Sequence, residues 1–197
     1  KNAKKYSLVD SEKIFEDMPD AIEGINGIDG EEYYVPIMKG GGIEYYKPNI
    51  WFMNWNRESV SHYKEDKKSR FQNSSYYFKQ GIGVPMVSSK QITAALIDFR
   101  LFDQSIVGIF PEEEKWTWYL LAFFNSKTCN KLIRTINPTA NNSANYIKKI
   151  PFIMPESKIL EQIEKNVSSL YHDLSNGIQS TQKKNVLNSL ISQVYGF

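Results

Sequence analysis

The feature that most constrains this chain is a change in the spacing of its apolar residues near residue 115. Before that point, short segments alternate apolar and polar residues or are rich in aromatic and β-branched residues, and Gly, Pro, Asn or Ser bound each one. This is typical of strands. After it, apolar residues recur every three to four positions, which is typical of amphipathic helices. The sequence therefore predicts an α+β fold, with a β-rich core followed by a helix and a C-terminal helical hairpin.

The same patterns predict the individual elements. One helix is expected to begin at Trp116 and to end before Pro138, because proline does not continue a helix. Two amphipathic helices are expected around 159–170 and 186–195, with Asn176-Gly177 as the break between them. The expected strands lie at 33–37, 50–55, 75–79, 83–87, 92–98 and 105–110.

These elements divide the chain into three consecutive segments. Residues 1–30 are an acidic connector rich in turn residues, 31–155 are a β-rich domain, and 156–197 are the helical hairpin. A length of 197 residues is enough for one good core with a small appended subdomain. The chain begins at Lys1 without Met, so we expect it to be a piece of a longer polypeptide.

Charge is distributed unevenly along the chain. Residues 1–38 carry 4 basic and 9 acidic side chains, residues 39–155 carry 16 and 9, and residues 156–197 carry 4 and 4. The net charges of these segments are therefore −5, +7 and 0, which agree with the total of +2. A basic middle segment beside an acidic flank is expected if the middle segment faces phosphates.

Composition excludes several classes of protein. A single Cys rules out a disulfide framework and fits a reducing cytoplasm, and two scattered His residues give no zinc-site spacing. No metal site is predicted. No apolar run reaches the roughly 20 residues needed to span a bilayer, so we expect a cytoplasmic protein with no membrane partner.

Three clusters of polar, basic and aromatic residues carry the candidate chemistry. In the first, the glycines of Lys39-Gly40-Gly41-Gly42 allow close approach to a phosphate, and Tyr46 and Lys47 follow. Nearby amide and guanidinium groups, those of Asn54, Asn56 and Arg57, are able to contact base edges in the major groove. The alternative interpretation is a glycine-rich hairpin with half-buried aromatic residues.

The second cluster spans residues 62–90 and the third spans 137–149. Cations interleaved with aromatic rings in the second suit phosphate contacts, although residues 62–69 equally fit a solvated loop. The third is an Asn-rich loop followed by two lysines, in which Asn137 is expected to form an Asx turn. The cations of the second cluster are Lys64, Lys67, Lys68, Arg70, Lys79 and Lys90.

From residue 34 onward the chain also carries short motifs in a particular order. They are Lys39-Gly40-Gly41, the aromatic and Asn stretch 51–56, Tyr77-Phe78-Lys79-Gln80-Gly81, Ser88-Ser89, Phe102-Asp103, Ile109-Phe110-Pro111, Leu120-Leu121-Ala122-Phe123-Phe124-Asn125-Ser126, Asn137-Pro138-Thr139, Lys148-Lys149-Ile150-Pro151 and the closing Val194-Tyr195-Gly196-Phe197. This order resembles the C-terminal target-recognition region of adenine-specific DNA methyltransferases of the type IIG restriction and phage-exclusion (BREX-like) kind. The chain departs from that pattern at 43–47, at 84–87 and near Leu96, where the arginine that usually follows the Ser pair is replaced.

The resemblance implies a domain that recognises a sequence in double-stranded DNA and is itself non-catalytic. A covalently linked or associated methyltransferase domain would bind S-adenosylmethionine and flip and methylate the adenine. No cofactor is expected in this chain. The DNA-binding residues implied are Lys39, Gly40, Gly41, Tyr46, Lys47, Asn54, Asn56, Arg57, Lys79, Ser88, Ser89, Thr139, Asn141, Asn142, Lys148 and Lys149.

Other functions stay open at the level of sequence. Asn137-Pro138-Thr139-Ala140 resembles the base-clamping tetrapeptide of adenine methyltransferases but lacks its second proline and its aromatic residue, so no methyl transfer is expected. A specificity subunit of a multi-subunit restriction-modification system is one alternative. A metal-dependent nuclease using Asp103, Glu113 and Lys115 is a second, and an aromatic-rich carbohydrate- or protein-binding module is a third.

Overall fold

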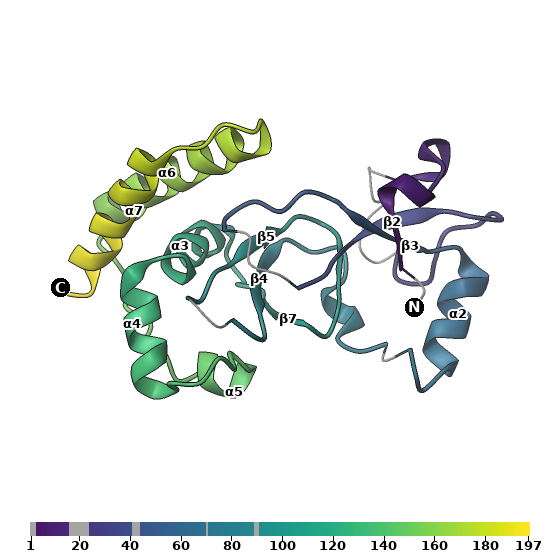
Figure 1. The fold of residues 1–197 in the computed structure, drawn as a ribbon, viewed down its shortest axis with the longest axis horizontal. Helices are drawn as coiled ribbons and strands as arrows, with labels where there is room; N and C mark the ends of the chain where they lie inside the picture. The colour runs from purple at the N-terminus through teal and green to yellow at the C-terminus, as the bar shows by residue number, and fades with distance from the viewer. Residues whose placement is uncertain (1–2, 16–23, 41–43, 70, 89–90) are drawn as a thin grey trace. The chain divides into compact units, whose positions relative to one another are not determined.

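The computed structural model describes residues 3–15, 24–40, 44–69, 71–88 and 91–197. The structure combines helices with two small β-sheets, and the C-terminal helices are present (Figure 1). This confirms the predicted α+β class. The chain forms two compact units: unit 1 comprises Lys1–Lys39, Pro48–Gln80 and Ile97–Gln104, and unit 2 comprises Gly40–Lys47, Gly81–Leu96 and Ser105–Phe197. Each unit is therefore assembled from separate stretches of chain, whereas the sequence pattern suggested three consecutive segments. None of the helices in the described residues has the length and apolar character of a membrane span.

Unit 1 is built on a four-stranded sheet in the order β1-β3-β2-β6. Strands β2 (Tyr34–Met38) and β3 (Trp51–Asn54) pair antiparallel and confirm the segments predicted at 33–37 and 50–55. β1 (Ala3–Lys5) joins the free edge of β3 antiparallel, and β6 (Leu101–Phe102) joins β2 in parallel. Two short 3-10 turns, Tyr6–Leu8 and Ser11–Lys13, follow β1.

The core of unit 1 is a cluster of aromatic rings around Trp55. The buried indole donates its N–H to the Gly24 carbonyl at 2.6 Å. Phe71 stacks on the indole with ring centroids 6.0 Å apart, and Tyr77 and Phe78 meet it edge-on at 6.0 and 5.6 Å. These contacts explain why the strand predicted at 75–79 is wrong. The chain instead forms a 3-10 turn at Ser74–Tyr76, which turns Tyr77 and Phe78 into the cluster.

Helix α2 (Arg57–Glu65) of unit 1 was not predicted. Its first turn is closed by Asn56, whose side-chain oxygen accepts a hydrogen bond from the Ser59 backbone N–H at 2.9 Å. This is a common N-cap arrangement. Only Val60 and Tyr63 of the helix are buried. Two apolar positions in nine residues give a weak helical period, so the sequence pattern did not show the helix.

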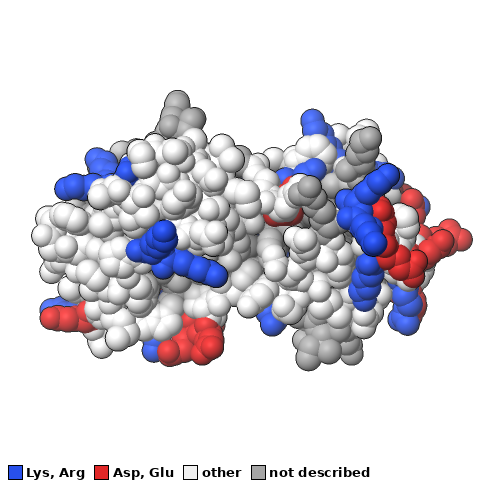
Figure 2. Space-filling view, turned by 90° about the horizontal axis from the view of Figure 1, so that it is seen from below, with Lys and Arg blue, Asp and Glu red and all other residues white. Residues whose placement is uncertain are grey.

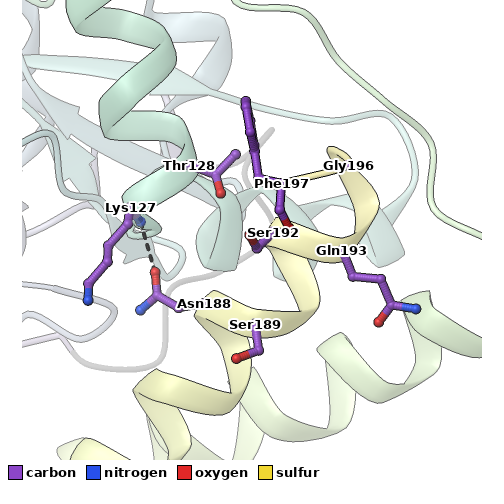
Figure 3. Close-up of a pocket in the computed structure, with 8 residues that line it drawn as sticks. All are labelled: Lys127, Thr128, Asn188, Ser189, Ser192, Gln193, Gly196 and Phe197. Carbon is purple, nitrogen blue, oxygen red and sulfur yellow. Dashed lines mark hydrogen bonds between the residues drawn. The ribbon is translucent and has the colours of Figure 1, made fainter.

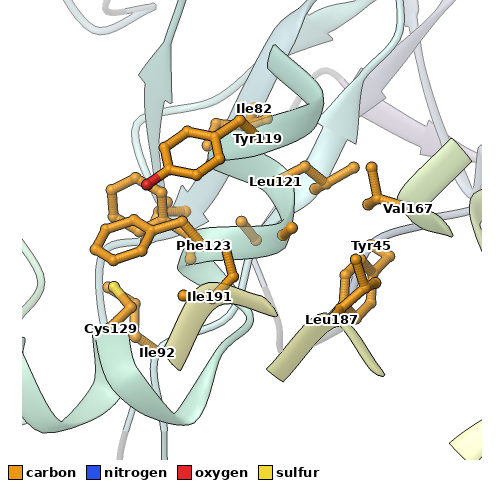
Figure 4. Close-up of a cluster of buried hydrophobic side chains, with 14 of the residues drawn as sticks. Tyr45, Ile82, Ile92, Tyr119, Leu121, Phe123, Cys129, Val167, Leu187 and Ile191 are labelled. Atoms are coloured by element: carbon orange, nitrogen blue, oxygen red, sulfur yellow. The ribbon is translucent and has the colours of Figure 1, made fainter. Parts of the chain in front are cut away.

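Unit 2 contains a three-stranded sheet in the order β5-β4-β7. β4 (Gly81–Pro85) and β7 (Ile106–Ile109) pair antiparallel, and β5 (Ala95–Ile97) lies at the other edge of β4. All three overlap predicted strands. Helix α3 (Glu114–Phe124) packs against β4 and against the C-terminal helices, and the buried core lies between them (Figure 4).

The single helix predicted between Trp116 and Pro138 is in fact two helices, α3 and α4 (Lys127–Ile136). The break falls at Asn125 and Ser126. The Ser126 hydroxyl donates to the Phe123 carbonyl at 2.7 Å and accepts from the Cys129 N–H at 3.0 Å, so it ends one helix and begins the next. Apolar residues on both sides of the break face the same core, and the apolar pattern therefore continues through it.

The C-terminal hairpin consists of α6 (Ser157–Ser175) and α7 (Thr181–Val194), preceded by the one-turn helix α5 (Ala144–Ile147). The predicted break at Asn176-Gly177 is confirmed, and Gly177 takes the left-handed φ of +77° that favours glycine. The apolar faces of the hairpin enter the unit 2 core rather than pairing only with each other. Its buried residues are Ile163, Val167, Leu170, Leu187 and Ile191.

Candidate nucleic-acid interface

The structure divides the predicted DNA-binding residues between the two units. Gly41 and Ser89 lie outside the described residues. Lys39 and Arg57 belong to unit 1 and Lys148 to unit 2, so a common DNA-facing surface for these three residues stays a prediction. Unit 1 holds Lys39, Asn54, Asn56, Arg57 and Lys79, and unit 2 holds Gly40, Tyr46, Lys47, Ser88, Thr139, Asn141, Asn142, Lys148 and Lys149.

The residues of the first cluster that belong to unit 2 have structural roles. Gly40 donates its N–H to the Ser105 hydroxyl at 2.7 Å, and its carbonyl accepts from the Lys47 ammonium at 3.1 Å. Lys47 is only 9% exposed, so the phosphate contact predicted for it is corrected to a structural one. Tyr45 is buried in the core, and the Tyr46 ring meets that of Tyr171 edge-on at 5.4 Å. Of the alternative interpretation, the structure shows a buried aromatic residue in Tyr45, which forms a parallel bridge with Ala95.

Two of the amides predicted to read bases are engaged by the backbone of unit 1. Asn54 Oδ1 accepts from the N–H groups of Tyr33 and Asn56, both at 3.2 Å. Asn56 is buried, caps α2 with its oxygen, and donates Nδ2 to the Glu31 carbonyl at 2.6 Å. The base contact predicted for Asn56 is therefore corrected, because both ends of its amide hold the fold together.

The predicted cations of unit 1 lie on the surface or against aromatic rings. Arg57 is exposed and forms a two-point ion pair with Asp29, in which Nε–Oδ1 and Nη2–Oδ2 are each 2.9 Å. Lys39 Nζ lies 4.5 Å from the centroid of the Trp51 ring, and Lys79 Nζ lies 5.7 Å from that of Tyr76. An exposed ion pair of this kind contributes about 0–1 kcal/mol, so a phosphate is able to compete with Asp29 for Arg57.

The Asn-rich loop of unit 2 is ordered by its own side chains. Asn137 Nδ2 donates to the Asn141 carbonyl at 2.6 Å, and Asn137 Oδ1 accepts from the N–H and the hydroxyl of Thr139 at 3.2 and 2.9 Å. This is the Asx turn predicted for Asn137. The backbone is thereby fixed while Thr139 and Asn141 remain exposed.

This loop pairs with the chain that follows β4. Val87 and Asn141 form an antiparallel bridge, flanked by hydrogen bonds from Ser88 N–H to the Ala140 carbonyl at 2.9 Å and from Asn142 N–H to the Met86 carbonyl at 2.7 Å. We call residues 86–88 and 140–142 the ribbon. Asn142 is fully buried and donates Nδ2 to the Pro85 carbonyl at 3.2 Å, so its predicted DNA contact is also corrected to a structural role.

Arg134 of α4 anchors the ribbon from behind. Its guanidinium donates to the carbonyl of Ser88, which is in the ribbon, at 3.0 Å and to the carbonyl of Thr139, which directly precedes its other side. Arg134, Val87 and Met86 were not among the predicted site residues. No sequence signal identified them, because the pairing that gathers them joins segments about 50 residues apart.

The segment that carries one side of the ribbon is basic. Residues 115–155 contain 6 Lys and Arg and no Asp or Glu. The α4–α5 surface, as we name it, is formed by the cations of α4 and of the turn after α5, and α4 packs against α5. Figure 2 shows Lys and Arg side chains on the left-hand part of the molecule standing in a largely uncharged surface, with acidic groups at its lower margin. The cations of the α4–α5 surface are Lys127, Lys131, Arg134, Lys148 and Lys149.

A separate open pocket lies between the first turn of α4 and the last turns of α7 (Figure 3). Most of the residues that line it have polar side chains, and Asn188 Oδ1 within it accepts from the Lys127 N–H at 2.8 Å. None of the predicted DNA-binding residues lines it. Phe197 is its aromatic wall, and the Lys131 ammonium lies 4.5 Å from the centroid of that ring.

The nuclease alternative gains no support. Glu113 forms an ion pair with Lys115 at 2.5 Å, which lowers the pKa of the exposed Glu113 carboxyl, and Asp103 belongs to the other unit. Across the described parts of the chain no group of three or more His, Cys, Asp or Glu is placed to hold a metal ion. Comparison with known proteins finds no family model and no curated protein that matches the chain.

Proposed function

We propose that the chain is a sequence-specific recognition domain for double-stranded DNA that serves an adenine-specific DNA methyltransferase of the restriction-modification or phage-defence kind. The observation that carries the proposal is the α4–α5 surface of unit 2, where α4 and the turn after α5 carry five cations, one of which, Arg134, contacts the ribbon, and residues 115–155 contain no Asp or Glu. A surface of one sign attracts a polyanion and adds salt-dependent affinity for phosphates.

The parts of this surface suit different tasks. Lys148 and Lys149 are exposed at the end of α5 and provide mobile positive charges for phosphates, which position the duplex without reading it. The ribbon presents Asn141, and Thr139 lies just before it, on a backbone that Asn137 and Arg134 hold in place. A two-stranded ribbon fits the major groove of B-DNA, where base pairs are distinguishable.

The order of short motifs from Lys39 to Phe197 supports the assignment to a methyltransferase system. In such a system this chain recognises the target, and a linked or associated domain binds S-adenosylmethionine and methylates the flipped adenine. The described residues contribute positioning and sequence readout to that reaction.

The test is a titration of a fluorescently labelled duplex with the 197-residue chain at 50 and 200 mM salt. We expect binding that weakens steeply with salt, with a slope in log K against log salt of roughly −0.9 for each phosphate contacted. A carbohydrate- or protein-binding module would be indifferent to salt and would not bind the duplex. Absence of binding even at 50 mM salt contradicts the proposal.

A further inference from the structure

The pairing of Val87 with Asn141 puts two different side chains at one point of the ribbon. The flanking hydrogen bonds run from Ser88 to Ala140 and from Asn142 to Met86, so Val87 and Asn141 themselves are a non-hydrogen-bonded antiparallel pair. In such a pair the side chains lie on the same face and closer together than at any other position of a sheet. The isopropyl group of Val87 and the amide of Asn141 therefore form one composite surface.

Both side chains face solvent. Val87 is 71% exposed, which is unusual for a β-branched residue whose backbone is held on both sides. Asn141 is exposed, and its Oδ1 accepts from the Ser143 N–H at 2.9 Å. Its Nδ2 has no hydrogen-bond partner within the described residues. The pair thus presents methyl groups beside an N–H donor whose direction is fixed by the Ser143 contact.

The chemistry of this pair matches one base. In the major groove thymine offers a C5 methyl group directly beside the O4 acceptor, whereas cytosine offers a donor at N4. A Val87 methyl group would contact the C5 methyl group of thymine, and the Asn141 Nδ2 would donate to thymine O4, so the pair satisfies both features at once. Cytosine would set its N4 donor against the Asn141 donor.

We infer that Val87 and Asn141 together read the major-groove edge of a thymine, with Val87 as a specificity-determining residue. This inference rests on the proposed function. The positive charge of the α4–α5 surface complements the negative charge of the DNA backbone. Lys148 follows Asn141 by seven residues, four of which form the single turn of α5, so the Cα atoms of the two residues lie within roughly 17 Å of each other. Phosphate contacts from Lys148 and Lys149 would then hold the groove against the ribbon.

The experiment begins with the 197-residue chain and a pool of randomised duplexes, from which the preferred sequence is selected. Each thymine of that sequence is then replaced in turn by uracil, which removes only the C5 methyl group. We expect one position at which this replacement weakens binding of the unaltered protein by about fourfold, the value of one buried methyl group. In Val87→Ala that sensitivity should disappear.

Two further variants make the test specific. Val186→Ala, at a valine on α7 that is 40% exposed, is the matched control and should keep the sensitivity to uracil. Asn141→Asp keeps the acceptor for the Ser143 N–H but loses the donor. It should change the preference at the same position from thymine to cytosine, by roughly tenfold, because a carboxylate accepts from cytosine N4. Circular dichroism establishes that all variants are folded.

The outcomes separate this inference from the proposed function. If the chain binds DNA and Val87→Ala shows the same uracil sensitivity as the unaltered protein, the inference is wrong and DNA recognition stands. Binding without any sequence preference also overturns the inference, together with the sequence-specific part of the proposed function. If the chain does not bind duplex DNA at low salt, both fall.

Discussion

The side chain of Asn125 pairs with the backbone of Ala94 as a neighbouring strand would. Asn125 Oδ1 accepts from the Ala94 N–H at 3.0 Å, and Nδ2 donates to the Ala94 carbonyl at 2.8 Å. The same Nδ2 donates to the Leu121 carbonyl at 2.8 Å. One buried amide thus joins the end of α3 to the residue before β5.

Replacing Asn125 with Leu should lower the free energy of unfolding by about 2–4 kcal/mol, because the buried N–H and carbonyl of Ala94 lose their partner. Urea denaturation followed by circular dichroism measures this change. Asn145→Leu is the control, since Asn145 is exposed on α5, and it should shift stability by less than about 0.5 kcal/mol. If the two substitutions lowered the free energy of unfolding equally, the pairing of Asn125 with Ala94 would contribute nothing to stability.

Asn56 gives a prediction that separates folding from DNA contact. Asn56→Ala should destabilise the protein by about 1–2 kcal/mol through loss of the α2 cap. Asn56→Asp keeps the oxygen that accepts from Ser59 N–H but loses the donor to Glu31, so its effect should be smaller than that of Ala. Stability is read from urea unfolding and DNA affinity from titration. A selective loss of DNA affinity with unchanged stability would return Asn56 to the interface.

The basic α4–α5 surface predicts a charge effect on binding. Replacing Lys148 and Lys149 with Ala should weaken binding to all duplexes and reduce the salt slope by roughly one unit for each phosphate that the variant no longer neutralises. The control is Lys158→Ala with Lys165→Ala, two exposed lysines of α6 beside acidic residues. If the α6 variant weakens binding as much as the α4–α5 variant, net charge rather than this surface governs the affinity.

The buried thiol of Cys129 makes stability depend on pH in the alkaline range. Burial raises the pKa of this thiol, and the folded protein therefore keeps its proton when the unfolded chain loses it. The stabilisation is fully present below the unfolded value of about 8.5 and is lost as pH rises above it, by up to about 1.4 kcal/mol per pH unit.

Unfolding free energies at pH 8.0, 9.0 and 10.0 measure this slope. Cys129→Ala should be less stable at every pH, because it leaves a cavity, but its stability should decline less between pH 9 and 10. Buried Tyr45 and Tyr119, whose pKa values burial also raises, add their own losses above about pH 10 and set the upper limit of the window. If the unfolding free energies of the unaltered protein and of Cys129→Ala fell equally between pH 9 and 10, Cys129 would not be the source of the pH dependence.

Sequence periodicity predicted the long elements of this fold well. Helices α6 and α7 bury a regular apolar stripe, and a glycine with positive φ separates them, so both the helices and their break could be read from the pattern. The break between α3 and α4 was missed, although Ser126 is a common helix cap, because the apolar pattern runs through it. Helix α2 was missed because Val60 and Tyr63 alone give it a weak apolar period, and because Asn56, its cap, was interpreted as a base contact.

The candidate site was harder to predict than the fold. Lys47 and Asn142 have the chemistry of DNA-binding residues, but their partners are backbone carbonyls, those of Gly40 and Pro85, that only the folded chain brings near. Conversely, only the bridge between Val87 and Asn141 gives an ordinary valine its place in the proposed interface. Residue type suggests what a side chain is able to bind, whereas burial and distant partners decide whether it is available.

The chain passes five times between unit 1 and unit 2, after residues 39, 47, 80, 96 and 104. No single cut separates the two units, so neither can be transferred intact to another protein by exchanging one contiguous piece of a gene. Recombination at one junction would split a sheet instead of delivering a finished module. Substitutions at the exposed positions of the ribbon leave both sheets intact, so the surface of this fold can change residue by residue without an exchange of whole units.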